Sequence, residues 1–184
     1  MDIKIGSNYL LDPEFILNRA RIAEGNRVAD LGCGSSGHFV FPASQKVGGK
    51  GRVFAVDILK KTLEVIKKRA EQENINNIET VWSDLEVYKG ADIESESLDV
   101  ALLINTLFQS SNKPAILREV ARLLKKNGRL LVVEWEMSDL PIGPPAESRV
   151  KKNHLIEIAK KTGLKNENEF KAGKHHYGIL FTKM

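Results

Sequence analysis

The alternation of strand-like and helix-like segments is the feature that most restricts the fold of this chain. Short apolar runs alternate with amphipathic segments of helical periodicity, and no repeat or low-complexity linker interrupts the series. Five strands are predicted at residues 27–31, 51–57, 78–82, 98–104 and 129–135. Strands separated by helices form a parallel sheet with right-handed crossovers. The chain is therefore predicted to have an α/β fold built on a doubly wound sheet.

Helix and turn signals mark the segments between these strands. Asp12 is a preferred helix N-cap, Pro13 suits the first turn, and Gly25 ends this lead-in helix. Later helices are predicted up to about residue 46 and at about 59–73, 112–126 and 150–162. Residues 164–183 predict a hairpin that turns near residues 172–173 and adds an antiparallel edge to the sheet.

Length and composition predict a single soluble domain. The 184 residues suffice for one core, with residues 1–25 as a lead-in segment and helix. Hydrophobic residues make up 42% of the chain and charged residues 28%, which argues against disorder, collagen-like sequence and coiled coil. One cysteine, Cys33, excludes an intrachain disulfide and a multi-thiolate zinc site, and favours the reducing cytoplasm. The N-terminal residues do not resemble a signal peptide, and the apolar run 100–104 is too short to span a bilayer.

A glycine-rich loop follows the first predicted strand. Residues 30–37 are Asp-Leu-Gly-Cys-Gly-Ser-Ser-Gly and contain the spacing Gly-x-Gly-x-x-Gly. Such glycines allow unusual backbone angles and let a ligand approach main-chain N–H groups. Asp57 ends the second strand, 57 − 37 = 20 residues after the last glycine, a spacing at which an acid can bind both ribose hydroxyls. These features alone also fit a dinucleotide such as NAD.

Two further features favour a different nucleoside ligand. Asp30 lies two residues before the first glycine, where it would repel a pyrophosphate but attract an ammonium group. Ser83 and Asp84 follow the third strand, where they can accept a hydrogen bond from an adenine amino group. A ligand with an ammonium, a ribose and an adenine but no phosphate is S-adenosylmethionine.

The chain resembles the class I S-adenosylmethionine-dependent methyltransferases of the small methyltransferase-domain type. The resemblance covers most of the chain, in order, and lies in residues 28–37, 53–57, 82–84, 98–105 and 123–135. It implies a Rossmann-like sheet of seven strands, mostly parallel, in which the last strand is antiparallel and inserted before the sixth. It also implies enzymatic transfer of a methyl group.

The resemblance implies roles for individual residues. Gly32 and Gly34 would line the methionine moiety, Asp57 would bind the ribose, and Asn105 would lie beside the sulfonium. Cys33 would be a small residue of the loop with a structural role.

The adenine end of the site follows from the same resemblance. Ile58 would pack on the adenine, and Asp84 with Leu85 would contact the edge of the ring. Each polar residue of the set also has an ordinary structural interpretation as a helix cap or a turn residue.

The methyl acceptor is predicted to be a small molecule that receives the methyl group by direct in-line displacement at the sulfonium. Tyr9, Gln109 and Glu136 are candidate catalytic residues near the expected acceptor site, together with Asn8 and Trp135. For Glu136 a solvent-exposed surface role is at least as well supported. Residues 105–108 lack the Asn/Asp-Pro-Pro-Tyr/Phe signature of enzymes that methylate exocyclic amines of bases or glutamine.

Three alternative functions remain at this stage. Methylation of RNA or protein is suggested by a net charge of +4 and several lysine pairs, although these pairs lie mostly on polar helix faces. A nicotinamide-dependent oxidoreductase is disfavoured because none of Tyr9, Tyr88 and Tyr177 is followed by lysine four positions later. A cofactor-binding module without catalysis is the third.

No metal site is predicted. The neighbouring His175 and His176 would face opposite sides of a regular strand and so could not bind one ion together. Packing or solvent exposure is the favoured role of these histidines.

Overall fold

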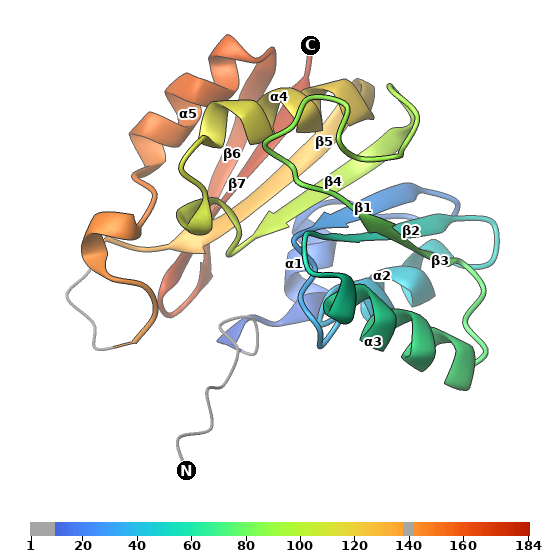
Figure 1. Cartoon of the computed structure of the whole chain (residues 1–184). Coiled ribbons are helices and arrows are strands. Elements are labelled where there is room, and N and C mark those ends of the chain that lie inside the picture. The colour runs from blue at the N-terminus through green and yellow to red at the C-terminus, as the bar shows by residue number, and fades with distance from the viewer. Residues whose placement is uncertain (1–9, 138–141) are drawn as a thin grey trace.

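A single seven-stranded sheet organises the structure (Figure 1). The computed structural model describes residues 10–137 and 142–184. The strands are β1 (Arg27–Leu31), β2 (Arg52–Asp57), β3 (Ile78–Trp82), β4 (Leu98–Ile104), β5 (Leu124–Trp135), β6 (Leu164–Gly173) and β7 (His176–Lys183). Their order is β3-β2-β1-β4-β5-β7-β6, and β7 pairs antiparallel with both β5 and β6 while the other pairs are parallel. The predicted mostly parallel sheet with an antiparallel strand inserted before the sixth is confirmed.

Helices cover both faces of this sheet (Figure 1). They are α1 (Pro13–Arg19), α2 (Val40–Val47), α3 (Lys60–Gln72), α4 (Lys113–Leu123) and α5 (Lys152–Lys161). α1, α2 and α3 lie on one face, and α4 and α5 lie on the other. As predicted, Asp12 caps α1, its side chain accepting a hydrogen bond from the Glu14 N–H at 3.0 Å.

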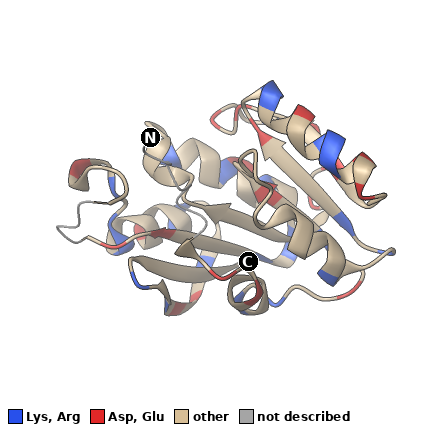
Figure 2. Ribbon diagram, turned by 90° about the horizontal axis from the view of Figure 1, so that it is seen from below, with Lys and Arg blue, Asp and Glu red and all other residues tan. Residues whose placement is uncertain are grey.

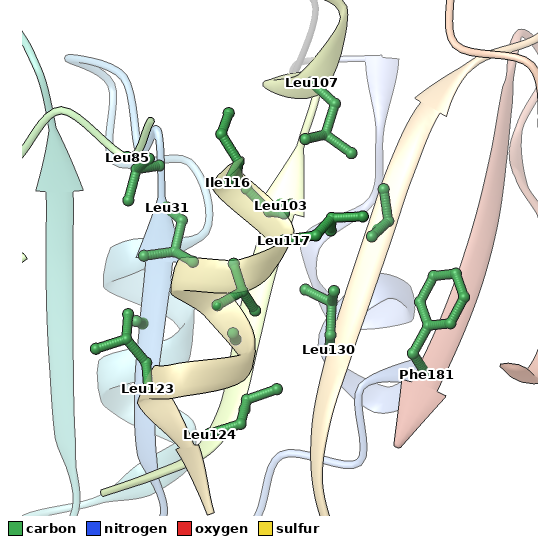
Figure 3. Close-up of a cluster of buried hydrophobic side chains, with 14 of the residues drawn as sticks. Leu31, Leu85, Leu103, Leu107, Ile116, Leu117, Leu123, Leu124, Leu130 and Phe181 are labelled. Atoms are coloured by element: carbon green, nitrogen blue, oxygen red, sulfur yellow. The ribbon is translucent and has the colours of Figure 1, made fainter. Parts of the chain in front are cut away.

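The core has two parts because strand side chains point alternately to the two faces. In β4, Val100, Leu102 and Ile104 join the cluster under α1, α2 and α3. Leu103 points the other way and packs with Leu117 of α4, as Figure 3 shows. A strand that is apolar at successive positions is therefore suited to the centre of the sheet.

Several predicted boundaries were wrong. The helix predicted at 112–126 ends at Leu123, because the backbone is extended at Leu124, which is buried and pairs with Leu98 of β4. β5 consequently begins five residues before the predicted start at Arg129, with an irregular register and a positive φ of 63° at Asn127. The lead-in helix ends at Arg19, well before Gly25. No helix separates β3 from β4, since residues 83–97 form turns and irregular backbone.

The strand order reverses between β1 and β4. β1 pairs with β2 on one side and with β4 on the other. In doubly wound sheets ligands bind outside the carboxyl ends of the strands at such a switch point. The residues that follow these strands are therefore the ones to inspect for a site.

Candidate active site

A cavity of about 440 Å³ lies at the carboxyl ends of β1 to β4. Its size falls in the range of small-molecule and cofactor sites. The loops after these four strands supply most of its wall, together with the first turns of α3 and α4. Among the residues predicted for the site, the wall includes Gly32, Gly34, Asp57, Ile58, Asp84, Leu85 and Gln109.

The glycine loop is fixed by its neighbours and open toward the cavity. The N–H groups of Gly32 and Cys33 donate to the Val56 carbonyl at 2.8 and 3.0 Å. At Gly32 φ is +84°, and a Cβ atom there would lie 2.7 Å from Oγ1 of Thr106, so glycine is required. At Gly34 φ is +64°, and a Cβ atom would meet nothing within 4 Å. The loop thus offers free space to a ligand at Gly34, while its N–H groups at residues 32–34 are bonded within the protein.

Asp57 connects this loop to the start of α3. Its Oδ2 accepts a hydrogen bond from the Gly34 N–H at 3.1 Å, and its Oδ1 accepts from the Leu59 N–H at 2.9 Å. A carboxylate oxygen can accept two hydrogen bonds, so each oxygen retains capacity for a ligand hydroxyl. Asp57 is therefore held in place and able to bind a ribose diol.

Asp30 lies beneath the loop at the end of β1. Its side chain is buried, and Oδ2 has no hydrogen-bond partner among the described residues. Burial and, to a smaller extent, the negative charge of Asp57 raise the pKa of Asp30 to about 7. Asp30 does not form part of the cavity wall. A cation bound nearby would lower this pKa by stabilising the carboxylate.

Apolar residues and two small polar groups form the other end of the cavity. Ile58 and Leu59 are 54% and 63% exposed and lie on its wall. Asp84 closes a turn, with Oδ1 accepting from the Glu86 N–H at 2.9 Å. The buried hydroxyl of Ser83 has no hydrogen-bond partner in the described parts of the chain. Exposed apolar groups beside unused hydrogen-bonding atoms suit a purine ring.

Two more predicted cofactor residues do not line the cavity. The Cys33 side chain is buried in the core under α1, α2 and α3, and burial raises the pKa of its thiol far above the usual range. Asn105 follows β4 with φ of 54°, and its N–H donates to the Val133 carbonyl at 2.9 Å. Asn105 lies behind the wall, where its carbonyl accepts from Nε2 of Gln109 at 3.0 Å.

The candidates for acceptor chemistry are separated by the fold. Gln109 lies on the cavity wall, whereas Glu136 lines a different hollow with Lys152 and His175. Trp135 is buried, and its ring packs against His176 with centroids 4.2 Å apart. Asn8 and Tyr9 lie outside the described residues.

The two histidines differ in their surroundings. Burial, with the nearby charges of His175 and Arg149, lowers the pKa of His176 to about 4, so its ring is neutral at physiological pH. His175 is partly exposed beside Glu136. Within residues 10–137 and 142–184 no three His, Cys, Asp or Glu side chains gather as ligands for one metal ion.

Sequence reasoning missed two residues that shape the site. Thr106 lies on the cavity wall and donates through Oγ1 to the Leu31 carbonyl at 3.0 Å. Glu134 is a fully buried acid near the end of β5 whose carboxylate accepts hydrogen bonds from the segment after β4. The available signal was a lone acid in the apolar run 130–135.

The fold and the cavity define the class of protein. A glycine loop at the switch point, an acid that joins it to the next helix and an apolar end beyond this acid form a nucleoside-binding site of the Rossmann type. A model of the methyltransferase domain matches residues 22–179. The chain belongs to this methyltransferase domain family, and S-adenosylmethionine is the cofactor that the family and its solved structures indicate.

Individual known proteins are similar to this chain. A demethylmenaquinone methyltransferase of Lactococcus lactis is 30% identical over 136 residues, which is 74% of this chain and 52% of that protein. A ubiquinone/menaquinone biosynthesis C-methyltransferase of Pseudomonas putida is 30% identical over 135 residues, 73% of this chain and 51% of that protein. The chain thus spans about half the length of these curated relatives. A crystal structure of a SAM-dependent methyltransferase from Aquifex aeolicus matches with a TM-score of 0.87 and 22% identity, over 98% of this chain and 94% of that one.

Proposed function

We propose that this protein transfers the methyl group of S-adenosylmethionine to a small-molecule acceptor. The observation that carries this proposal is the placement of Asp57, whose carboxylate joins the glycine loop to α3 at the edge of a cavity of cofactor size. The matching family supports the same reaction class.

The residues of the cavity fit this cofactor. Asp57 would bind the ribose, the open backbone at Gly34 would face the methionine moiety, and Ile58 would pack on the adenine. The unused Oδ2 of Asp30 would attract the ammonium group, directly or through water. S-adenosylmethionine supplies an electrophilic methyl group on a sulfonium. The task of the protein is then to hold the acceptor in line with it and to exclude water.

A quinone-type ring is the acceptor class that we propose to assay first. The names of the two curated relatives support this class. Gln109 and Ser110 lie on the wall beyond Thr106. The amide oxygen of Gln109 can accept a hydrogen bond from an acceptor molecule, whereas the Ser110 hydroxyl already donates to Oε1 of Glu86 at 2.6 Å and can only accept. Neither side chain is a base, so these residues would act by orientation.

A location in the cytoplasm is part of the proposal. Cys33 is buried and unpaired, as in proteins of reducing compartments. Over the part of the chain that the structure describes, no helix has the length and apolar character needed to cross a bilayer.

Calorimetric titration of the purified chain with S-adenosylmethionine, S-adenosylhomocysteine and NAD tests the cofactor assignment. We expect micromolar binding of the first two ligands and none of NAD. Asp57→Ala should weaken binding by about 1.5–3 kcal/mol, or about 10- to 150-fold, because it removes a charged hydrogen-bond acceptor. The exposed Asp92→Ala is the matched control and should bind as the wild type does. Binding of NAD alone would refute the transferase proposal.

A second assay tests the acceptor. Formation of S-adenosylhomocysteine is measured with a short-chain reduced demethylmenaquinone, and with an RNA pool and a protein lysate as the competing acceptor classes. Turnover with the quinone and not with the polymers supports the proposal. The reverse result would assign a macromolecular acceptor.

A further inference from the structure

We propose that Glu134 is a positioning residue that holds the cavity wall after β4 in place. This inference deepens the proposed function, because the wall in question borders the methionine end of the cavity and the side from which an acceptor would enter. Glu134 does not line the cavity itself and would act only through this segment.

The contacts of Glu134 reach across from β5 to the segment after β4. Its Oε1 accepts hydrogen bonds from the N–H groups of Leu107 at 2.7 Å and Phe108 at 3.3 Å. These residues begin a single 3₁₀ turn, Leu107–Gln109, whose first N–H groups have no carbonyl partner within the turn. Glu134 and Leu107 are fully buried, so water cannot replace this acceptor. Removing it would leave the buried N–H of Leu107 unpaired, and the partly buried N–H of Phe108 would lose the same acceptor.

The segment that Glu134 holds carries the wall. Thr106, Gln109 and Ser110 line the cavity on either side of the two bonded residues. Thr106 also packs against Gly32 and donates to the Leu31 carbonyl, so its position limits that of the glycine loop. A shift at Leu107 would therefore displace both the wall after β4 and the glycine loop.

The chemistry of Glu134 is costly for a purely structural residue. Its Oε2 is buried without a hydrogen-bond partner among the described residues. Burial raises the pKa of the carboxyl to about 7, although the backbone N–H groups of Leu107, Phe108 and Trp135 and the charge of Lys113 lower it. A buried acid without an ion-pair partner destabilises the fold relative to an apolar residue of similar size. We infer that the geometry of the wall compensates for this cost.

Glu119 provides a matched comparison within the same chain. It is also fully buried and also accepts two backbone N–H groups, from Lys89 at 2.8 Å and Ala91 at 3.2 Å. Unlike Glu134, it forms an ion pair with Arg122 at 2.6 Å, which keeps the pKa of its carboxyl low. Lys89 and Ala91 do not line the cavity. The wall residues of the same loop end at Glu86, so loss of Glu119 should loosen the part of the loop beyond the wall.

Hydrogen exchange and calorimetry on Glu134→Leu, Glu134→Gln and Glu119→Leu test the proposal. In Glu134→Leu the side-chain volume stays but the acceptor is lost, so amide exchange in residues 105–110 should be about tenfold faster and S-adenosylhomocysteine should bind about tenfold more weakly. Glu134→Gln keeps an acceptor oxygen, so its exchange rates at residues 105–110 and its affinity for S-adenosylhomocysteine should be close to those of the wild type. Glu119→Leu should speed exchange only at residues 89–91 and leave the affinity within about twofold of the wild type.

The outcomes separate this inference from the proposed function. Unchanged exchange at 105–110 in Glu134→Leu would overturn the positioning role, as would an equal loss of affinity in Glu134→Leu and Glu119→Leu. Exchange is measured on the ligand-free protein. If the wild type binds no S-adenosylhomocysteine, the proposed function fails while the exchange result still decides the role of Glu134. If Glu134→Leu does not fold, Glu134→Met takes its place, because methionine also lacks the carboxylate acceptor. Wild-type exchange at residues 105–110 and wild-type affinity in Glu134→Met would refute the inference.

Discussion

At the scale of single residues, the site depends on carboxyl groups whose surroundings differ sharply. Asp57 is anchored by two backbone N–H groups at the cavity edge. Asp30 is buried close to the charge of Asp57, and its Oδ2 has no hydrogen-bond partner among the described residues. The first arrangement favours binding of neutral hydroxyls. The surroundings of Asp30 disfavour its ionised form, and a bound cation would stabilise that form.

The pKa of Asp30 leads to a prediction for the pH dependence of binding. Because this pKa is about 7 in the free protein, the carboxyl is mostly neutral below pH 7, whereas an ammonium group favours its ionised form. Affinity for S-adenosylmethionine should therefore fall by about eightfold from pH 7.5 to pH 6, since the ionised fraction drops from about three quarters to about a tenth. Calorimetry at both pH values measures this change, and Asp30→Asn is the control that should show a flat profile. A wild-type affinity that does not change with pH would show that Asp30 does not interact with the ammonium group.

The same shift has a consequence for stability. A carboxyl with a pKa of 3.8 in the unfolded chain and about 7 in the folded protein is stabilising in its neutral form, so its contribution is present below pH 4 and is lost as the pH rises through 7. Asp30 is thus a residue at which function and stability oppose one another.

Sequence patterns located the polar anchors of the site better than its walls. Spacing from the glycines identified Asp57, and position at a strand end identified Asp84, because both depend on local chain geometry. Glu134 and Thr106 act across strands β4 and β5, and no local pattern reveals which loop a strand residue will contact. Cys33 was included with its loop, although alternation of side chains turns it into the core.

At the scale of elements, a hydrogen bond attaches the segment before α5 to strand β7. The hydroxyl of Tyr177 donates to the Val150 carbonyl at 2.6 Å, and both residues are buried. Val150 lies just before the first turn of α5, so this bond fixes the helix on the antiparallel strand.

Tyr177→Phe should lower the free energy of unfolding by about 1–3 kcal/mol, because it leaves a buried carbonyl without a donor while keeping the ring. Urea denaturation measures the difference. Tyr88→Phe, at an exposed position, is the control and should be neutral. If both variants are equally stable, the bond does not fix α5.

Element boundaries were predictable where capping residues determine them and wrong where pairing does. Asp12 sets the start of α1 through its own side chain. The end of α4 is set instead by Leu124, which pairs with Leu98 of β4, twenty-six residues earlier in the chain. Helical periodicity through residue 126 could not reveal that competing partner.

At the scale of the whole molecule, basic and acidic residues are interspersed along the described parts of the chain. Figure 2 shows Lys and Arg interspersed with Asp and Glu over the helices and loops. The excess of 28 − 24 = 4 positive charges is small for a protein that tracks a nucleic-acid backbone.

We therefore expect weak RNA binding. Filter binding with a mixed-sequence RNA should give affinities no tighter than about 10⁻⁶ M near physiological salt, the range of non-specific contacts. Tight binding with a steep dependence on salt concentration would instead support an RNA acceptor. The wild-type protein with S-adenosylhomocysteine present is the appropriate comparison, because cofactor binding can order an acceptor surface.

The sequence by itself determined the sheet, its class and the glycine–acid framework of the cofactor site. These features follow from periodicity, from strand-end positions and from spacing along the chain, all of which are local. Tertiary structure alone decided that Glu134 faces the segment after β4, that Glu136 lies in a separate hollow, and that Asp30 is buried close to the charge of Asp57. Those outcomes depend on strand order and register, which place side chains distant in the sequence next to one another and remove them from water.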